Sequence, residues 1–195
     1  SVTGVQTCAL PIYGFSLTEG VIGKADDIRL VEIEHAEGGL RLLVTLSPER
    51  AHAQLARTRN MAGRTGCGVC GIDDLAALPR AEVAERPKTA LRLSAVRRAL
   101  RDLSRLQALN EATRAVHGAA WFDAEGGGPV VREDVGRHNA LDKLVGALAR
   151  RGVDPASGFV LVTSRCSFEM VEKSAAFGAR AIVAVSAPKI GRAHV

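Results

Sequence analysis

Alternating apolar and charged positions predict a β-hairpin in the first third of the chain. From Asp27 to Glu34 every second residue tends to be apolar, as in a strand with one buried face. Residues 37–39 are Glu-Gly-Gly, which favours a turn, and residues 40–46 are again rich in leucine and valine. We therefore expect two antiparallel strands joined by a short turn.

Three stretches of the first half have helical patterns. Residues 14–21 suit a short helix that ends near Gly23. Ser47 is a good N-cap, and a proline and an acid follow it, so we expect a helix over residues 48–60. Residues 91–106 place leucine and valine near helical spacing and predict a strongly amphipathic helix.

The second half of the chain alternates short apolar runs with helical patterns. The apolar runs lack polar alternation, which is typical of strands buried on both faces. We expect strands over residues 119–123, 129–132, 158–163 and 180–185, and helices over residues 136–151 and 167–177. Apolar strands linked by helices predict a sheet covered on both faces, so the fold class is α/β, preceded by a small α+β region.

This organisation suggests two structural regions between two unrelated ends. Residues 14–86 form the small N-terminal α+β region, and residues 87–188 form the α/β domain. Residues 1–13 and 189–195 do not continue either pattern and resemble translated sequencing-adapter sequence. We expect both ends to be foreign or disordered and exclude them, with Cys8, from the fold.

The amino-acid composition disfavours some classes of ligand. Aromatic residues make up only 4% of the chain, which disfavours the base-stacking platforms of single-strand binders. The net charge of +5 suits a phosphate-bearing ligand or an acidic protein surface better than nucleic acid. The densest basic group lies on the polar face of the 91–106 helix and comprises Arg92, Arg97, Arg98, Arg101 and Arg105. We interpret it as a solvated face, with partner docking as the alternative.

Four cysteines and no membrane-length apolar run favour a cytoplasmic protein with reduced thiols. Cys67 and Cys70 form a C-x-x-C pair within the glycine-rich residues 63–74. Glycine lets this backbone fold tightly, and Arg64 would favour a thiolate. A thiolate at Cys67 can accept sulfur from a partner's persulfide, and Cys70 can then close on Cys67 and expel that sulfur.

Other interpretations of the cysteine pair remain open. A zinc site would need two further ligands, such as His117 and His138, whose spacing fits no common zinc finger. A thioredoxin-like pair should follow a strand directly, and inert loop cysteines would contribute little to packing. His35-Ala36-Glu37 resembles the first half of a zinc-deaminase signature, but a glycine stands where a proline should precede Cys67.

A second dense group of polar residues runs from Glu133 to Lys143, between a strand end and a helix start. Helix N-termini favour anions, and Arg137 can bind a phosphate through two hydrogen bonds. The neighbouring candidates for ligand binding are Glu133, Asp134, Gly136, His138 and Asn139. The acids could accept from a guanine edge or orient His138; helix capping with an Asp134–Arg137 ion pair is the alternative.

A similar polar turn follows the next apolar strand. Ser164 and Arg165 lie in this turn, and Ser167 is placed to cap the following helix, while Cys166 more simply packs than reacts. We expect both polar turns to lie at one edge of the sheet, where ligands of α/β proteins usually bind. His117 could line that crevice or be an ordinary core histidine.

These motifs together resemble the FdhD/NarQ family of formate dehydrogenase accessory sulfurtransferases. The resemblance extends over about residues 14–188. The stretches that carry it are Gly14–Ile22, Arg64–Gly71, Glu133–Lys143, Ser164–Lys173 and Val185–Pro188.

The resemblance implies a fold, an activity and partners. It implies that residues 87–188 have a cytidine deaminase-like fold without the deaminase zinc, in a cytoplasmic homodimer that binds neither nucleic acid nor membrane. Such proteins take sulfur from a cysteine desulfurase and pass it to the molybdenum cofactor, as bis-molybdopterin guanine dinucleotide, for formate dehydrogenase. Cys67 would carry the persulfide, Cys70 would be its partner, and the polar turns would face the guanine nucleotide. A molybdenum-cofactor or guanine-nucleotide chaperone and a zinc protein are the alternatives.

The sequence departs from the family pattern in two respects. Where the family has T-G-G-x-H, this chain has Thr113 to His117 with Arg114 and Ala115 in place of the glycines, which argues against a close approach of backbone and ligand there. The family segments expected before Gly14 and beyond Pro188 are also not recognised, and we expect weaker folding or binding as a result.

Overall fold

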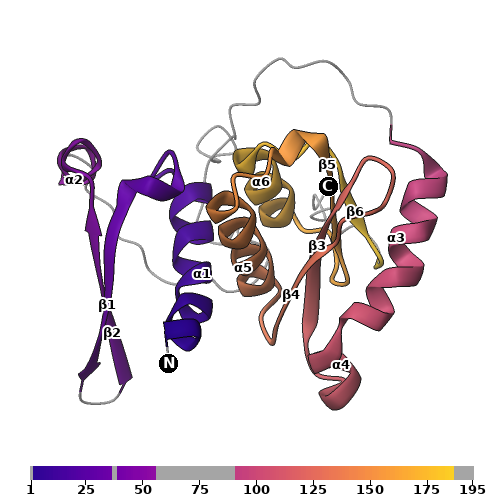
Figure 1. The fold of residues 1–195 in the computed structure, drawn as a ribbon, viewed down its shortest axis with the longest axis horizontal. Coiled ribbons are helices and arrows are strands. Elements are labelled where there is room, and N and C mark those ends of the chain that lie inside the picture. Colours follow the sequence, from indigo (N-terminus) through magenta and orange to yellow (C-terminus); the bar gives the residue numbers. More distant parts are fainter. Residues whose placement is uncertain (1, 37–38, 56–90, 187–195) are drawn as a thin grey trace, which may run out of the picture.

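The structure is a computed structural model that describes residues 2–36, 39–55 and 91–186. A four-stranded sheet lies between helices, and a separate two-stranded hairpin lies beyond the first helix (Figure 1). The helices are α1 (Val2–Thr18), α2 (Pro48–Leu55), α3 (Leu93–Leu106), α4 (Ala108–Thr113), α5 (Arg137–Arg150) and α6 (Phe168–Phe177). The strands are β1 (Ile28–Ala36), β2 (Gly39–Leu46), β3 (His117–Asp123), β4 (Val130–Asp134), β5 (Gly158–Val162) and β6 (Ile182–Ala184).

The sheet has the order β4-β3-β5-β6. Strand β3 runs antiparallel to both β4 and β5, whereas β5 and β6 are parallel. Strands β4 and β5 therefore end at the same edge, and β3 begins there. The helices that follow them, α5 and α6, have their N-termini at this edge as well, because each starts within a few residues of the strand end.

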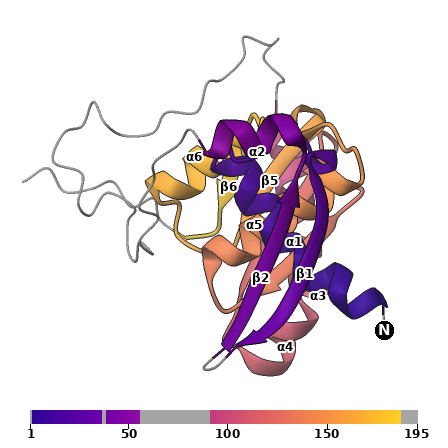
Figure 2. The ribbon, with the colours of Figure 1, turned by 90° about the vertical axis from the view of Figure 1, so that its left-hand side faces the viewer.

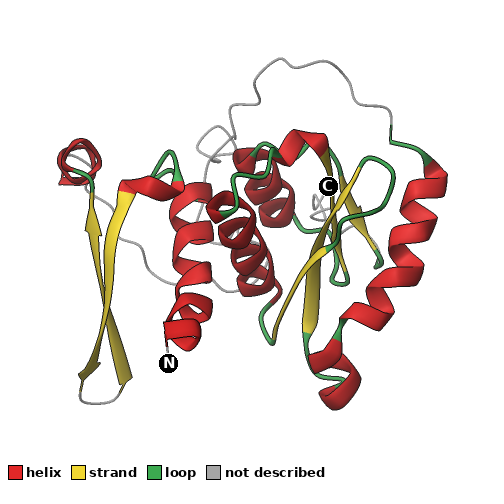
Figure 3. Ribbon diagram, in the orientation of Figure 1, coloured by secondary structure: helices red, strands yellow, loops and turns green. Residues whose placement is uncertain are grey.

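Both faces of the sheet are covered, as predicted from the apolar strands (Figure 3). On one face α5 and α6 bury leucines and Met170 against Trp121, Val160 and Val162. On the other face α3 packs its alanines and Leu103 against Phe122 and Phe159, whose rings stack with centroids 5.9 Å apart. Successive side chains of β3 and β5 point to opposite faces of the sheet and so contribute to two separate hydrophobic cores.

Helix α1 lies along α5 and is longer than predicted. It begins at Val2 rather than near Gly14, and Leu10 is buried in the core that α5 shares with the sheet. A side chain at Gly14 would collide with the backbone carbonyl of Asp142, and one at Gly146 would collide with the carbonyl of Leu10. The two helices therefore approach at the level of their backbones, and residues 9–13 pack into the fold.

The predicted hairpin is confirmed, and β1 pairs with β2 through antiparallel register from Ile28 opposite Leu46 to Ala36 opposite Gly39. It lies in front of α1 when the molecule is turned (Figure 2). Leu42 and Val44 on one face of the hairpin line, with Phe15 of α1, an open and mainly apolar cavity of about 430 Å³.

The remaining helices mostly follow the sequence pattern. Helix α3 starts two positions inside the predicted 91–106, and α5 and α6 match their predicted spans to within one residue at each end. Helix α4 was not predicted. The end of the helix expected to reach residue 60, the boundary near residue 86 and the tail 189–195 lie outside the described residues. No helix in the described part is both long and apolar enough to cross a membrane.

Candidate functional site

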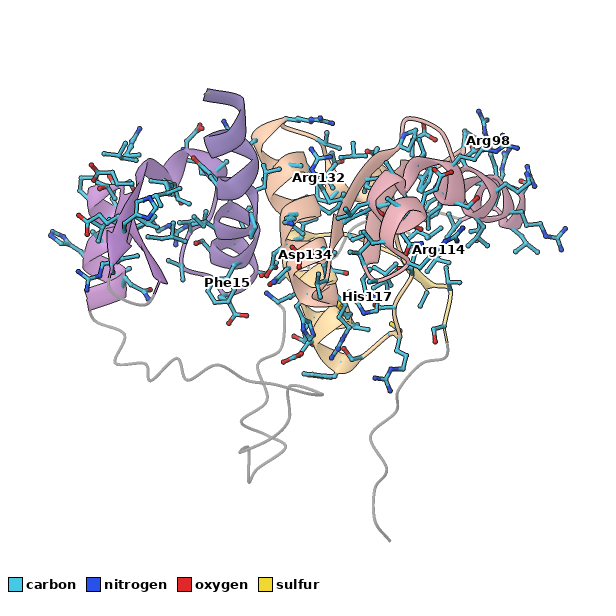
Figure 4. All side chains as sticks on the ribbon, turned by 90° about the horizontal axis from the view of Figure 1, so that it is seen from below. Phe15, Arg98, Arg114, His117, Arg132 and Asp134 are labelled. Carbon is cyan, nitrogen blue, oxygen red and sulfur yellow. The ribbon has the colours of Figure 1, made fainter. Side chains whose placement is uncertain are left out.

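The sequence-predicted polar turns do meet at one edge of the sheet. His117, the first residue of β3, stands opposite Asp134, the last residue of β4. On the other side of β3, Thr163 extends β5: its backbone N–H donates to the Gly118 carbonyl at 3.0 Å, and its hydroxyl accepts from the Gly118 N–H at 2.8 Å. Figure 4 views this edge from below, with His117 and Asp134 close together.

Asp134 organises the start of α5. Its Oδ1 accepts from the Gly136 N–H at 2.8 Å and from the Asn139 amide at 3.4 Å, while its Oδ2 forms an ion pair with Lys143. Burial opposes ionisation of this carboxyl, but Lys143 and the Gly136 N–H outweigh it and hold the pKa of Asp134 below its usual value. Its partner is Lys143, not Arg137 as the alternative interpretation had it.

Glu133 caps a neighbouring helix. Its two carboxylate oxygens accept from the backbone N–H groups of Leu109 and Asn110, each at 2.9 Å, and so cap the N-terminus of α4. Among the described residues no hydrogen bond or ion pair joins His138 to Glu133 or Asp134; the carboxylate paired with His138 is Glu169. Glu133 and Asp134 thus already have partners in the protein, and their acceptance of hydrogen bonds from a guanine edge stays a prediction. Lys143 also donates to the Glu133 carbonyl at 3.2 Å.

We expect Glu133→Ala to lower the free energy of unfolding by about 1–2 kcal/mol, because two helix N–H groups lose their acceptors. Urea denaturation followed by circular dichroism measures this loss. Glu111→Ala, an exposed acid on the same helix, is the matched control and should cost under about 0.5 kcal/mol. Equal effects of the two changes would contradict the capping role.

His138 connects α5 to α6. Its Nε2 lies 2.6 Å from Oε2 of Glu169, although the N–H direction does not give a well-aligned hydrogen bond. Burial, with the nearby charges of Arg137 and Lys173, lowers the pKa of His138 to about 4 despite that carboxylate. The imidazole is therefore neutral at physiological pH.

The second polar turn is partly buried. Ser164 is buried and its hydroxyl donates to the Arg165 carbonyl at 3.2 Å, whereas the Arg165 side chain is exposed. Ser167 stands at the N-cap position of α6, but its side chain makes no capping bond, and its hydroxyl is buried without a hydrogen-bond partner in the described structure. Burial raises the pKa of the half-buried Cys166, which agrees with a packing role.

A buried ionic cluster beside this edge was missed in the sequence. Lys173 of α6 donates to Asp142 of α5 at 3.0 and 3.3 Å and to the Thr18 hydroxyl at 2.9 Å, and it lies 3.6 Å from Glu19. The Phe15 ring lies 5.0 Å from the same ammonium. Burial raises the pKa of Asp142 to about 6 even though Lys173 acts in the opposite direction. All residues of this cluster lie in the stretches that resemble the FdhD/NarQ family. Their position in these stretches was the one feature of the sequence that could have indicated the cluster.

Several predicted features cannot be placed. The glycine-rich residues 63–74, with Arg64, Cys67 and Cys70, lie outside the described residues. His35 is exposed near the end of β1, and within the described residues no group of three or more His, Cys, Asp or Glu side chains is arranged to hold a metal. The structure brings together the remaining candidates: His117, Asp134, Gly136 and Asn139 around β3, β4 and α5; Arg137 and His138 in the first turn of α5; Ser164 and Arg165 after β5.

Comparison with known proteins decides the family. The family model described as the FdhD/NarQ family matches residues 6–191. The chain belongs to the FdhD/NarQ family. Its curated relatives include the sulfur carrier protein FdhD of Bordetella petrii, 51% identical over 175 residues, and that of Variovorax paradoxus, 48% identical over 174 residues. These alignments cover 90% and 89% of this chain.

The FdhD/NarQ relatives are longer than this chain, which spans 63% of the length of both. Among solved structures, a formate dehydrogenase accessory protein from Desulfotalea psychrophila matches with a TM-score of 0.61 at 25% sequence identity. That match covers 94% of this chain and 66% of the other. The mixed α/β fold described above is therefore shared with an accessory protein of formate dehydrogenase.

Proposed function

We propose that this FdhD/NarQ protein is a sulfurtransferase that carries a persulfide on Cys67 and delivers the sulfur to a molybdenum cofactor bound as bis-molybdopterin guanine dinucleotide. Membership of the family and the name sulfur carrier protein of its relatives support sulfur transport. The cysteine pair supplies the chemistry, because it is the one place in the sequence where two thiols lie close together.

The proposal that an anionic nucleotide binds here rests on the charges at the start of α5. Helix N-termini are positive and favour acids, yet the first turn of α5 contains none and instead carries the cation Arg137 and the neutral His138. The nearby acids are engaged elsewhere: Asp134 with Lys143, and Glu133 with α4. An anionic group such as a nucleotide diphosphate is favoured by the N–H groups at this helix start, and the N-terminus of α6 at the same edge would add to this preference.

The proposed transfer has two steps. The Cys67 thiolate attacks the outer sulfur of a donor persulfide, so a new S–S bond forms at Cys67 and the donor cysteine leaves as a thiolate. The Cys70 thiol then attacks Cys67, which forms a Cys67–Cys70 disulfide and releases the outer sulfur as hydrosulfide toward the bound acceptor. Cys70 supplies the two electrons, and a cellular thiol must later reduce the disulfide.

The remaining parts of the proposal concern surroundings and partners. We propose a cysteine desulfurase as donor, formate dehydrogenase as the enzyme that receives the sulfurated cofactor, and a homodimeric assembly in the cytoplasm. The finer fold assignment, a cytidine deaminase-like domain over residues 87–188, stays a prediction. The order β4-β3-β5-β6, with β3 antiparallel to its neighbours, is the feature on which a direct comparison should be made.

After incubation with a cysteine desulfurase and cysteine, we expect intact-protein mass spectrometry to show one added sulfur atom. The adduct should disappear in Cys67→Ala and persist in Cys166→Ala, a control at a half-buried cysteine of raised pKa. Cys70→Ala should accumulate the adduct, because the release step is lost. A Cys67→Ala protein that still gains sulfur would refute the assignment.

A chaperone that only binds the molybdenum cofactor or its guanine nucleotide is the second candidate, favoured by the same basic helix start. It differs in one measurable outcome. A chaperone with Cys67→Ser should bind guanine nucleotide and activate formate dehydrogenase normally, whereas a sulfurtransferase with that change should bind nucleotide but fail to activate. Stoichiometric zinc in elemental analysis would instead favour the zinc alternative.

A further inference from the structure

A line of arginines follows the outer face of α3, on the side of the sheet away from α1 and the hairpin (Figure 1). Arg97, Arg101 and Arg105 are exposed and each is followed by the next one turn along the helix. We call these three residues the α3 arginine stripe. Figure 4 shows the neighbouring Arg98 at the outer end of the molecule, on this helix.

The helix that carries the arginine stripe is packed firmly on the sheet. Ala95, Ala99 and Leu103, on the opposite face of α3, are each at most 3% exposed and pack against the sheet. At Gly126, whose φ is +78°, a side chain would meet the Ala95 carbonyl at 2.5 Å, so the helix and the β3–β4 turn are in close contact. The spacing of the three arginines is therefore set by a helix that is held on the sheet.

These arginines lack partners within the described residues, although acids do pair with their neighbours. Arg92 lies 3.8 Å from Glu125, and Arg98 lies 3.9 Å from Asp102. No acidic side chain of the described chain lies within ion-pair distance of the stripe. Like charges four residues apart on a helix cost about 0.2–0.5 kcal/mol per pair, so the stripe does not stabilise α3 by itself.

Exposed leucines flank the stripe. Leu93 is 63% exposed and Leu100 is 38% exposed, and their separation of seven residues places them along one side of the arginines. Apolar side chains beside arginines are typical of protein interfaces, where arginine is enriched. A second copy presenting the same basic face would be repelled, and nucleic-acid surfaces offer nothing for two exposed leucines.

We propose that the outer face of α3, formed by the arginine stripe with Leu93 and Leu100, is a docking surface for an acidic amphipathic helix of a partner protein. Carboxylates one turn apart on the partner would match the spacing of the arginines, and apolar residues beside them would cover the leucines. Helix α3 lies on the opposite face of the sheet from α5 and α6, and only its C-terminal end, at Arg105, approaches α4 and the candidate edge.

The test is fluorescence anisotropy with a labelled synthetic helix that carries glutamates four residues apart along one face and leucines beside them. We expect Arg97→Glu/Arg101→Glu/Arg105→Glu to weaken binding about tenfold or more, since each exposed pair contributes up to roughly 1 kcal/mol. The matched control, Lys24→Glu/Arg29→Glu/Arg151→Glu, changes three other exposed cations and the net charge by the same amount, and should weaken binding less than about threefold. The corresponding glutamine triple on the stripe should lie between wild type and the reversal.

The leucines give a separate measurement. Leu93→Ser/Leu100→Ser should weaken binding about threefold or more without changing its dependence on NaCl, because apolar burial and charge are affected separately. Equal losses in the stripe and control triples would overturn the proposal, as would equal affinity for a scrambled peptide of the same composition. Tighter stripe-dependent binding to duplex DNA or to vesicles of anionic lipid would overturn it as well.

Discussion

Lys173→Met should lower the free energy of unfolding by about 3–5 kcal/mol near pH 7.5, the usual cost of removing one partner from a buried ion pair. The Lys173 side chain is only 11% exposed and is shared by Asp142, Glu19 and Thr18. Without the ammonium, the Asp142 carboxylate is left buried with no cation in contact. Urea denaturation followed by circular dichroism measures the loss.

A mutant cycle separates this effect from a loss of packing. Lys24→Met removes an exposed lysine and should change stability by under about 0.5 kcal/mol. Asp142→Leu in the Lys173→Met background should recover part of the loss, because an apolar pair no longer leaves a charge buried. If Lys173→Met costs no more than an exposed ion pair, about 1 kcal/mol, the cluster does not hold the three elements together.

The ionic cluster around Lys173 connects the helices that form the candidate ligand site. Thr18 is the last residue of α1 and Glu19 follows it, while Asp142 and Lys173 come from α5 and α6. The same two helices place their N-termini at the candidate ligand edge, and Lys173 also lies close enough to His138 to depress its pKa. The position of α5 relative to α6 therefore depends on an ionic group supplied in part by the N-terminal segment.

Much of the fold could be predicted because its signals are local. Strand β5 is an unbroken apolar run, and α5 repeats its apolar residues at helical spacing. The type of each element and its buried residues can therefore be predicted from its own sequence. The expectation that the two polar turns meet at one edge is confirmed because β4 and β5 both run antiparallel to β3, so that both strands end there.

The parts that could not be predicted depend on distant residues. Helix α4 has six residues and is capped by Glu133, more than twenty positions away, so no local pattern indicates it. The early start of α1 depends on close packing between Gly14 and the backbone of α5, and Pro11 within the helix argues against it locally. The Lys173–Asp142 pair likewise joins two helices that only the tertiary fold brings together.

Asp142 and His138 should give stability opposite dependences on pH over the same range. The pKa of Asp142 is raised from 3.8 to about 6, so between these values the folded state holds more protons and stability falls as pH rises. The pKa of His138 is lowered from 6.5 to about 4, so in that interval the unfolded state holds more protons and stability rises with pH. In the wild type the two slopes largely cancel between about pH 4 and pH 6.

Substitution separates the two contributions. We expect Asp142→Asn to leave a stability that rises with pH across this range, and His138→Gln to leave one that falls, as measured by urea midpoints in buffers of constant ionic strength. The slope is the readout, because either change also removes contacts and lowers stability at every pH. A shift of both slopes in the same direction would contradict the assignment of opposite protonation. The same reasoning links the two predictions: since Asp142 can take up a proton near pH 5, the cost of Lys173→Met should be smaller there than at pH 7.5.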